Sequence, residues 1–545
     1  MKRILLACLL LAALLLGACG TGAATPARQD STGRYALSAA GEAILDDVDQ
    51  QYAADTEDNA RVFYEIFVGS FSDSDGDGVG DLRGIINRFD YLNDGDPASG
   101  LSLGVEGLWL TPIFKSPSYH KYDVSDYYTV DPDFGTLEDL RELAELCHSR
   151  NVKLILDLPI NHTGRMNEWF SNFVVAHRKQ DLDDPYYDFY CWIGEGESAE
   201  GRHFAQIAGA KEYYECNFDD AMPELNFDNE AVRQAVLDVA KFYLDLGVDG
   251  FRFDAAKYVY YGDNSTSASF WDWYLEELRA IRPDIYTVAE VWDGDGITDR
   301  YYSSMNCFNF TLSQSSGLIA ETAKAGNAGR YCAYVEDYLT RTRAIRPDAM
   351  IVPFISNHDM DRAAGFLSVA SGKMQMGANL YILGPGSPFL YYGEEIGIRG
   401  SRGSANTDAN RRLAMLWGDG DTVKDPTGSS YPAQEEVSVA EQLGRGDSLY
   451  NYYKRLLMLR RANPEIARGS YEAVAVPGSK VGGFIAEWNG SRVCVLHNPS
   501  LSGQSVDLRA LGLDFSRLVA FVGLEDASLE NGILQIGGQT SVILR

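Results

Sequence analysis

Short apolar runs and longer stretches of helical spacing alternate along most of the chain. The runs are rich in β-branched and aromatic residues, which favour strands, and they include VFYEIFV (from Val62), VEGLWLT, VKLILDL, VDGFRFD, IYTVAEV and MIVPFIS. The intervening stretches, such as TLEDLRELAELCHSR and EAVRQAVLDVAKFYLDLG, repeat apolar positions every three or four residues. This alternation predicts an α/β fold in which parallel strands are joined by helical crossovers.

Two further candidates, near CFNFTL and NLYILGPGSPFLYYG, bring the number of predicted strands to eight. Eight strands suit both a closed barrel and an open doubly wound sheet. The acidic residues decide between them, because Asp157, Asp254, Glu290 and Asp359 each lie at or just after the C-terminal end of an apolar run. Barrel enzymes collect catalytic groups on that rim, so we predict a (β/α)8 barrel over residues 61–162 and 229–465.

Two regions depart from the alternation. Residues 163–228, after the third strand, are rich in Tyr, Trp, Asp and Gly, and an insertion of this length predicts a functional inserted domain. After the helical pattern YNYYKRLLMLRRANPEI, residues 466–545 change to short alternating runs such as GGFIAEW and SRVCVLHN. These runs predict a C-terminal antiparallel β-sandwich domain.

The N-terminal residues 1–19 read as an export signal. A Lys-Arg pair precedes an apolar run from Ile4 to Leu16, which is too short to span a bilayer comfortably. The following LGAC resembles the bacterial lipobox, whose cysteine, here Cys19, becomes lipidated; a single buried cysteine is the alternative. Residues 20–60 begin with small and polar side chains typical of a tether. We therefore expect a lipid-anchored protein of the bacterial cell envelope, facing outward or periplasmic.

Net charge and cysteine content limit the classes of ligand and metal that the protein is expected to bind. The 78 acidic and 47 basic residues give a net charge of −31, which disfavours nucleic acid and anionic lipid head groups and favours a neutral ligand. None of the cysteines beyond Cys19 forms a CxxC pair, so zinc is not expected. Cys191 and Cys216 are close enough in sequence for a disulfide, but spacing leaves the pairing open. Composition does not indicate an oligomeric state.

The segment GFRFD carries both charges on one side of a predicted strand. Arg252 and Asp254 share one face, and Phe251 and Phe253 share the other. A cation beside a carboxylate favours the ionised form, which is the form of a nucleophile. For this segment alone, a structural ion pair is an equally good interpretation.

Other strand ends strengthen the catalytic interpretation. Glu290 stands in IYTVAEVW, where apolar neighbours can raise its pKa and keep a proton for a leaving group. One ionised and one protonated carboxyl are what retaining glycoside cleavage requires. Asp359 stands beside His358 in FISNHD, and His162 closes DLPINH. Each histidine alone could be an ordinary core residue, but both stand at strand ends beside acids.

The stretch DSDGDGVGD has the composition of a cation-binding loop. Its alternating carboxylates, in a Gly-rich turn, can surround a hard cation with oxygen, and calcium is the natural candidate. An EF-hand would need a glutamate where Gly84 stands, so that interpretation fails. A solvated acidic turn is the alternative. The predicted ligands are Asp73, Asp75, Asp77 and Asp81.

Four of these segments in order, DLPINH, GFRFDAAKY, TVAEVW and FISNHD, resemble the strand-end motifs of the α-amylase superfamily (glycoside hydrolase family 13). MPELNF at the end of the insert resembles a further motif of that family. The resemblance runs from Val62 to the C-terminus. It implies a retaining hydrolase that cleaves internal α-1,4 bonds of α-glucans.

The resemblance also implies roles for individual residues. Asp254 would be the nucleophile, Glu290 the acid/base and Asp359 a third carboxylate that binds sugar hydroxyls, with Asp157 as structural support. The acidic loop resembles a calcium loop to which Val79 adds its carbonyl oxygen. A second calcium at Asn161 is a further option. The implied substrate-binding residues are Tyr122, His162, Arg252, Lys257, Tyr258 and His358.

Several activities stay open within and outside this superfamily. DAAKY resembles α-amylases more than α-glucosidases, whereas HKYD at His120 resembles neopullulanases. A 4-α-glucanotransferase shares the first covalent step with a hydrolase. A glucan-binding lipoprotein without activity is the alternative from another class, but binding alone does not require a matched nucleophile and acid.

Overall fold

The computed structural model describes residues 58–96, 99–434 and 438–545. The predicted signal, the lipobox with Cys19 and the tether up to residue 57 lie outside the described residues. Among the described residues, no helix has both the length and the apolar character needed to cross a membrane.

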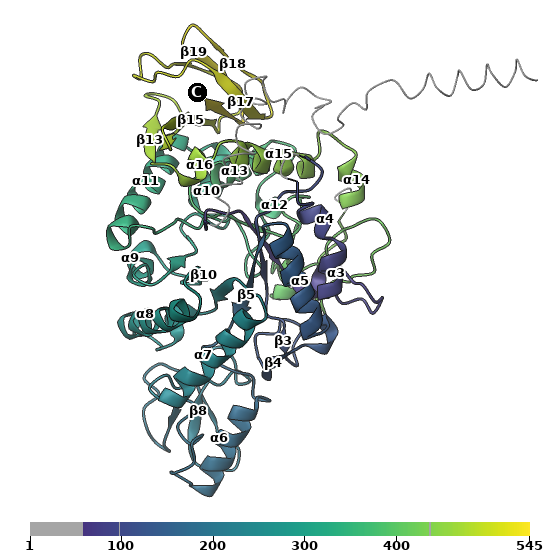
Figure 1. Ribbon diagram of the computed structural model, residues 1–545, viewed down its shortest axis with the longest axis vertical. Helices are drawn as coiled ribbons and strands as arrows, with labels where there is room; N and C mark the ends of the chain where they lie inside the picture. The colour runs from purple at the N-terminus through teal and green to yellow at the C-terminus, as the bar shows by residue number, and fades with distance from the viewer. Residues whose placement is uncertain (1–57, 97–98, 435–437) are drawn as a thin grey trace, which may run out of the picture.

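A parallel sheet forms the centre of the molecule (Figure 1). Its strand order is β11-β10-β9-β5-β2-β1-β12, and every neighbouring pair in it is parallel. The strands are β1 (Phe63–Ile66), β2 (Gly107–Leu110), β5 (Lys153–Leu158), β9 (Gly250–Phe253), β10 (Tyr286–Ala289), β11 (Asn306–Cys307) and β12 (Phe389–Tyr391).

The segment from Ile351 to Pro353 closes this sheet into a barrel. Val352 forms a parallel bridge with Phe308, just after β11. On the other side, the amide of Phe389 at the start of β12 donates to the carbonyl oxygen of Pro353 over 2.9 Å. The eight predicted strand positions therefore form a (β/α)8 barrel rather than an open sheet, as predicted.

Helices surround the barrel, and most of them have one apolar face that packs inward. Helix α5 is an example: Thr136 and Asp139 form a capping box at its start, and its apolar positions from Leu140 to Cys147 are buried against the sheet. The longer helices are α3 (Leu82–Asn87), α5 (Leu137–Ser149), α7 (Glu230–Asp245), α8 (Asn264–Ile281), α10 (Leu318–Ala325), α11 (Ala328–Ile345), α13 (Lys373–Ile382) and α15 (Leu449–Ala462). The short helices are α4 (Phe89–Leu92), α9 (Asp295–Thr298), α12 (Ala363–Phe366), α14 (Val439–Leu443) and α16 (Glu465–Arg468).

Strand β9 shows the side-chain alternation that the sequence predicts. Phe251 and Phe253 point outward into the core between sheet and helices, where the ring of Phe253 lies 4.7 Å from that of Trp271. Arg252 points inward, and its guanidinium lies 5.3 Å from the ring of Trp109 in the barrel interior. The first residue of the strand is Gly250. A larger residue does not fit there, because its Cβ would lie 1.8 Å from the carbonyl oxygen of Tyr286.

The inserted domain and the C-terminal domain lie at opposite ends of the molecule (Figure 1). The insert holds α6 (Glu168–Lys179) and the antiparallel strands β6 (Trp192–Ile193), β8 (Tyr213–Glu215) and β7 (Phe204–Gln206). A separate hairpin, β3 (Phe114–Lys115) with β4 (Asp126–Val130), precedes α5.

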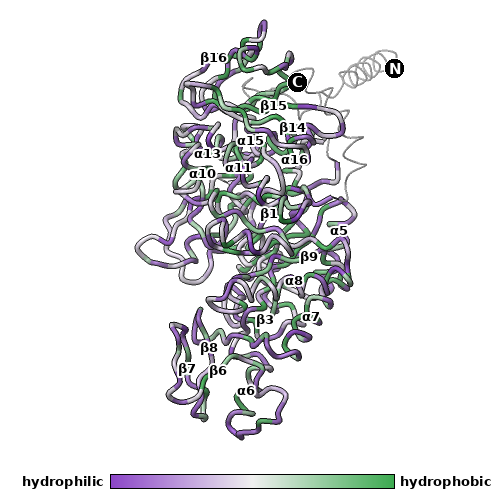
Figure 2. Tube along the Cα trace, turned by 90° about the vertical axis from the view of Figure 1, so that its left-hand side faces the viewer, coloured by the Kyte–Doolittle hydropathy of each residue, from purple (hydrophilic) through white to green (hydrophobic). Residues whose placement is uncertain are grey.

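Two antiparallel sheets form the C-terminal sandwich, and buried apolar residues from both sheets make up one cluster. Figure 2 shows hydrophobic positions along β14 and β15 of this domain. One sheet has the order β13-β14-β15-β20-β17 and the other β16-β19-β18. Their strands are β13 (Glu472–Ala475), β14 (Gly482–Trp488), β15 (Ser491–Asn498), β16 (Gln504–Asp507), β17 (Leu518–Gly523), β18 (Ala527–Glu530), β19 (Ile533–Ile536) and β20 (Thr540–Leu544).

Details of the sequence prediction need correction. The first part of NLYILGPGSPFLYYG belongs to α13, and its strand begins only at Phe389. The helix predicted over YNYYKRLLMLRRANPEI ends at Ala462, because Pro464 disfavours helical geometry at the preceding residue. Cys191 and Cys216 are both free thiols, so the suggested disulfide is absent from the described part of the chain.

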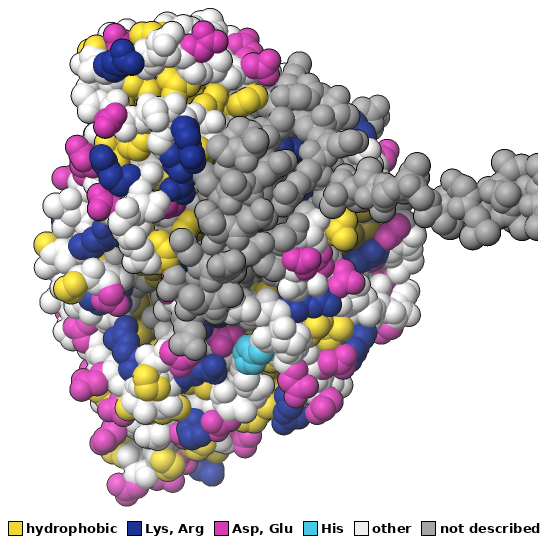
Figure 3. Space-filling model, turned by 45° about the horizontal axis from the view of Figure 1, so that its top comes forward, with side chains coloured by type: hydrophobic (Ala, Val, Ile, Leu, Met, Phe, Trp, Pro, Cys, Tyr) yellow, Lys and Arg dark blue, Asp and Glu magenta, His cyan; other side chains and the backbone are white. Residues whose placement is uncertain are grey.

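On the face shown in Figure 3, acidic and basic side chains are interspersed.

Candidate active site

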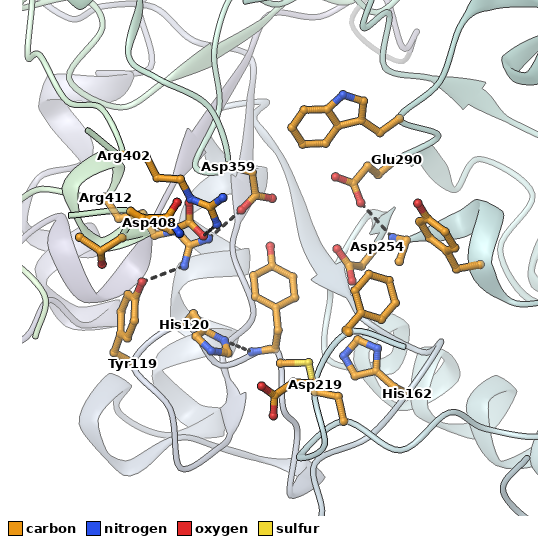
Figure 4. Close-up of a pocket in the computed structure, with 18 residues that line it drawn as sticks. Tyr119, His120, His162, Asp219, Asp254, Glu290, Asp359, Arg402, Asp408 and Arg412 are labelled. Atoms are coloured by element: carbon orange, nitrogen blue, oxygen red, sulfur yellow. Dashed lines mark hydrogen bonds and ion pairs between the residues drawn. The ribbon is translucent and has the colours of Figure 1, made fainter. Parts of the chain in front are cut away.

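A cavity of about 800 Å³ opens at the C-terminal ends of the barrel strands (Figure 4). Asp254 follows β9, Glu290 follows β10 and Asp359 follows the Ile351–Pro353 segment, so three predicted catalytic carboxylates share one wall region. Other lining residues come from the barrel loops and the insert: Tyr119, His120, Tyr122, His162, Phe218, Asp219, Met222, Ala255, Tyr258, Trp292, Arg402, Asn406, Thr407, Asp408 and Arg412.

Arg252 joins the carboxylates beneath this cavity. Its Nη1 lies 2.5 Å from Asp254 and 2.8 Å from Asp157, and its Nη2 lies 3.1 Å from Glu290. The guanidinium is buried, so it balances negative charge where water cannot. One planar fork therefore fixes the relative positions of the predicted nucleophile and the predicted acid.

The surroundings of Glu290 raise its pKa and so favour its protonated form. Burial raises its pKa to about 6, and the negative charges of Asp254 and Asp359 act in the same direction. Its Oε2 accepts a hydrogen bond of 3.0 Å from the amide of Ala255. Ala255 has a φ of 48°, a left-handed conformation that non-glycine residues rarely adopt and that concentrates at functional sites.

Asp359 has the opposite electrostatic character. Burial alone would raise its pKa, but the charges of His358 and Arg412 outweigh burial, and the pKa is lowered. Its Oδ2 lies 2.9 Å from Nε2 of His358, and its Oδ1 accepts from Arg412 over 2.7 Å. Asp359 is therefore an ionised group suited to accept hydrogen bonds from hydroxyls.

His358 and Tyr122 link Asp359 to the barrel interior. The hydroxyl of Tyr122 donates to Asp157 over 2.8 Å and lies 2.7 Å from Nε2 of His358. The other ring nitrogen of His358 lies 2.5 Å from the buried Glu65. Burial opposes protonation of His358, but its two acidic neighbours raise its pKa to about 10. Burial also raises the pKa of Asp157, to about 7.

Aromatic side chains form the walls on either side of the carboxylates. The ring of Phe218, from the insert, lies 5.4 Å from His162 and 5.3 Å from Tyr258. Trp292 stacks on Phe310 with ring centroids 4.9 Å apart. Rings that are exposed to the cavity offer apolar faces on which sugar rings can stack.

Apart from the acidic loop, five residues of the predicted site lie outside the cavity lining. Arg252, His358 and Asp157 are fully buried behind the catalytic carboxylates. The other two are Lys257 and Asn161. Lys257 turns away, and its ammonium donates to the carbonyl oxygen of Trp292 over 2.8 Å and to Asp293 over 3.0 Å. Asn161 is buried where barrel and insert meet, and its amide nitrogen donates to Glu224. The amide oxygen of Asn161 has no hydrogen-bond partner among the described residues.

Arg412 contacts the site carboxylate Asp359 but was not predicted from the sequence. It binds Asp359, and its Nε donates to the carbonyl oxygen of His358 over 3.1 Å. Its Nη1 also reaches the hydroxyl of Tyr119 over 3.1 Å (Figure 4). The sequence signal for Arg412 was the arginine pair in NRRLAMLW, which follows the last barrel strand. Nothing in that segment indicates that Arg412 pairs with Asp359.

The acidic loop has the donors for a hard cation. The carboxylates of Asp73, Asp75 and Asp81 lie within 4.8 Å of one another, whereas Asp77 is outside this group. Backbone amides of Gly76 and Gly78 donate to Asp73 over 2.7 and 2.8 Å and hold it toward the loop centre. Three converging carboxylates fit an oxygen-preferring divalent ion such as Ca²⁺.

Known proteins are similar to this chain in sequence and fold. Residues 65–469 match the family described as alpha amylase, catalytic domain. Alpha-amylase 3 of Dictyoglomus thermophilum is 35% identical over 445 residues, covering 80% of this chain and 84% of that protein. A 4-alpha-glucanotransferase of Thermotoga neapolitana is 30% identical over 451 residues, covering 80% and 95%. The structure of Eubacterium rectale Amy13B superposes with a TM-score of 0.81 at 34% identity, covering 90% and 96%.

Proposed function

Because the chain belongs to the α-amylase family of glycoside hydrolases, which act on glucans, we propose that it cleaves internal α-1,4-glucosidic bonds of starch and maltodextrins with retention of configuration. The observation that carries this proposal is the shared contact of Asp254 and Glu290 with Arg252 at one cavity wall. Two carboxyl groups flanking one linkage are the requirement for retaining cleavage.

The first step needs opposite protonation states of these two residues. Glu290, protonated below pH 6, would transfer its proton to the glycosidic oxygen as the bond to the leaving sugar breaks. The Asp254 carboxylate would form a covalent bond with the anomeric carbon from the opposite side. Arg252 would keep Asp254 in place through the 2.5 Å contact.

The second step reverses these roles. Glu290, ionised after the first proton transfer, would accept a proton from water, and the resulting hydroxide would displace Asp254 from the anomeric carbon. Asp359, held ionised by Arg412 and His358, would accept hydrogen bonds from the hydroxyls of the reacting sugar. Tyr122, His162 and Tyr258 would contact the same sugar.

Transfer to a second sugar is the competing outcome. A sugar hydroxyl bound on the leaving-group side could replace water in the second step, as a 4-α-glucanotransferase requires. The 30% identity with the Thermotoga enzyme supports glucan transfer as the second candidate activity. The 35% identity with Alpha-amylase 3 supports hydrolysis as the first choice.

We also propose that Asp73, Asp75 and Asp81 hold Ca²⁺, with Asp77 and the carbonyl of Val79 as further oxygen donors. The ion would neutralise the mutual repulsion of the carboxylates and hold the loop that follows β1. The unpartnered amide oxygen of Asn161 supports a second calcium position. Lipid attachment at Cys19 at the cell envelope is a proposal that rests on the N-terminal sequence.

Product analysis tests the proposed activity. Amylose, pullulan, a cyclodextrin and maltotriose are each digested, and the products are followed over time with their anomeric form recorded by NMR. We expect a range of maltooligosaccharides from amylose, released first as the α anomer. Longer chains made from maltotriose would identify a transferase instead, and β anomers would contradict retention.

A further inference from the structure

Three side chains of the insert form a cluster outside the cavity lining, with the composition of a transition-metal site. Nε2 of His203 lies 2.7 Å from Oδ1 of Asp220, and Sγ of Cys216 lies 3.9 Å from the same oxygen. One potential ligand atom from each of the three residues lies within 4.8 Å of the other two. Imidazole, thiolate and carboxylate are the ligands that zinc binds in proteins.

The backbone brings these residues together without help from an ion. The amide of Cys216 donates to the carbonyl oxygen of His203 over 2.9 Å, so the two are paired at the end of the β7–β8 hairpin. The hydroxyl of Tyr214 donates to the carbonyl oxygen of Asp220 over 2.8 Å and fixes the loop that returns the carboxylate to the hairpin. The three ligands thus come from two strand ends and one anchored loop.

The separations suit tetrahedral coordination after small movements. Metal–ligand bonds of about 2.0–2.3 Å at tetrahedral angles place neighbouring ligand atoms roughly 3.3–3.5 Å apart. The hydrogen-bonded His203–Asp220 pair must open slightly, and both side chains can do so because they are 59% and 62% exposed. Cys216 is buried beneath them and supplies a fixed base for the site. Water can provide a fourth ligand on the exposed side.

We propose that Nε2 of His203, Sγ of Cys216 and the carboxylate of Asp220 bind a divalent transition-metal ion of the zinc class. Binding would release the thiol proton to solvent and replace the hydrogen bond between His203 and Asp220 by two bonds to the ion. This site is separate from the acidic Asp73 loop, which has only oxygen donors. It also revises the sequence expectation against zinc, which considered only CxxC spacing.

An ion at this cluster would act on the substrate cavity. Cys216 and Asp220 bracket the segment that carries Phe218, and Phe218 forms part of the cavity wall beside His162 and Tyr258. Fixing both ends of this segment would restrict the movement of the Phe218 ring. The ion is therefore a structural element of the sugar-binding wall and has no part in bond cleavage.

Cobalt binding tests the proposal independently of any activity on glucans. The folded protein is titrated with Co²⁺ in excess Ca²⁺, which occupies oxygen-only sites, and binding is followed by absorption and calorimetry. We expect one bound equivalent with a thiolate-to-cobalt charge-transfer band. Cys216→Ser should abolish the band and raise the Kd at least about 100-fold. Cys191→Ser is the matched control, because its thiol lies in the same insert outside the cluster, and it should bind as the parent does.

A second variant covers the risk that a change at the buried Cys216 disturbs folding. His203→Gln alters an exposed side chain, so its melting temperature without metal should equal that of the parent. Zn²⁺ should raise the melting temperature of the parent and leave that of His203→Gln unchanged. Failure of the parent to bind cobalt, or parent-like cobalt affinity in either cluster variant, would overturn the proposal and leave an ordinary surface ion pair above a buried thiol.

Discussion

Replacing Glu290 by glutamine removes a proton donor and leaves the shape of the cavity nearly unchanged. With a pKa of about 6, about one Glu290 in ten is protonated at pH 7. A carboxyl with the ordinary pKa of 4.5 would be protonated in only about one molecule in 300, so burial increases the acid form about 30-fold. General acid catalysis typically contributes about 10²–10⁴-fold. Glu290→Gln should therefore lower kcat/KM on maltooligosaccharides about 10³-fold.

The assay compares two substrates that differ in the leaving group. A maltooligosaccharide needs a proton on its departing oxygen, whereas a maltosyl fluoride releases fluoride without one. Glu290→Gln should form the covalent intermediate from the fluoride at a rate within about tenfold of the parent. Resolution by water should be slow because the general base is also lost, and azide should restore turnover because it needs no base.

The pH profile of the parent gives a second readout. Because burial raises the pKa of Glu290, the acid form is lost as pH rises through about 6, and kcat/KM on a maltooligosaccharide should fall tenfold per pH unit above it. The first step with the fluoride should lack this alkaline limb. Equal losses on both substrates in Glu290→Gln, or the same limb with both substrates, would refute the acid role.

Three further perturbations test the neighbouring groups. Asp254→Asn should reduce turnover at least about 10⁴-fold while oligosaccharide binding persists in calorimetry; turnover within tenfold of the parent would reject the nucleophile role. Arg412→Met removes the 2.7 Å contact with Asp359 and should lower kcat/KM about 10- to 100-fold, and parent-like kinetics would show that Asp359 is held without it. A chelator should lower Tm by several degrees, since a ligand at 100 times its Kd adds about 2.7 kcal/mol of stability. Asp73→Asn should weaken this response, because the loop is one of the proposed metal sites, and an equal Tm shift in that variant would exclude the loop.

The parts of the site that the sequence predicted depend on local periodicity. Arg252 and Asp254 face the barrel interior because strand side chains alternate, and this pattern is visible in five residues. The ends of parallel strands lie on one rim, so Asp254, Glu290 and Asp359 could be expected together once the barrel was inferred. The distances between these carboxylates could not be predicted. Those of Asp254 and Glu290 depend on their shared contact with Arg252, and the position of Asp359 depends on Arg412.

Helix α13 shows why a local pattern can mislead. Every residue from Met374 to Ile382 is buried, because the helix packs against α15 on one side and the C-terminal strands β17 and β20 on another. A helix without a polar face has no 3.6-residue periodicity to detect, and its apolar run resembles a buried strand. The sequence NLYI at the end of α13 therefore predicts part of a strand.

Contacts between distant segments account for what the sequence did not reveal. Arg412 reaches Asp359 across 53 positions in the chain, and no local pattern specifies that pairing. Likewise, Phe218 reaches the cavity only because the insert folds back over the rim beside Tyr258. Lys257 shows the converse, since a short motif implied substrate contact but the side chain binds Asp293 instead.

Covalent trapping identifies the nucleophile directly. Glu290→Gln is incubated with a maltosyl fluoride, stopped in acid, digested and analysed by mass spectrometry. We expect one maltosyl group attached to Asp254, and no label when Asp254 is replaced by asparagine in the same background. A label on any other residue, or full turnover without a trapped sugar, would contradict the claim that Asp254 and Glu290 act on one bond.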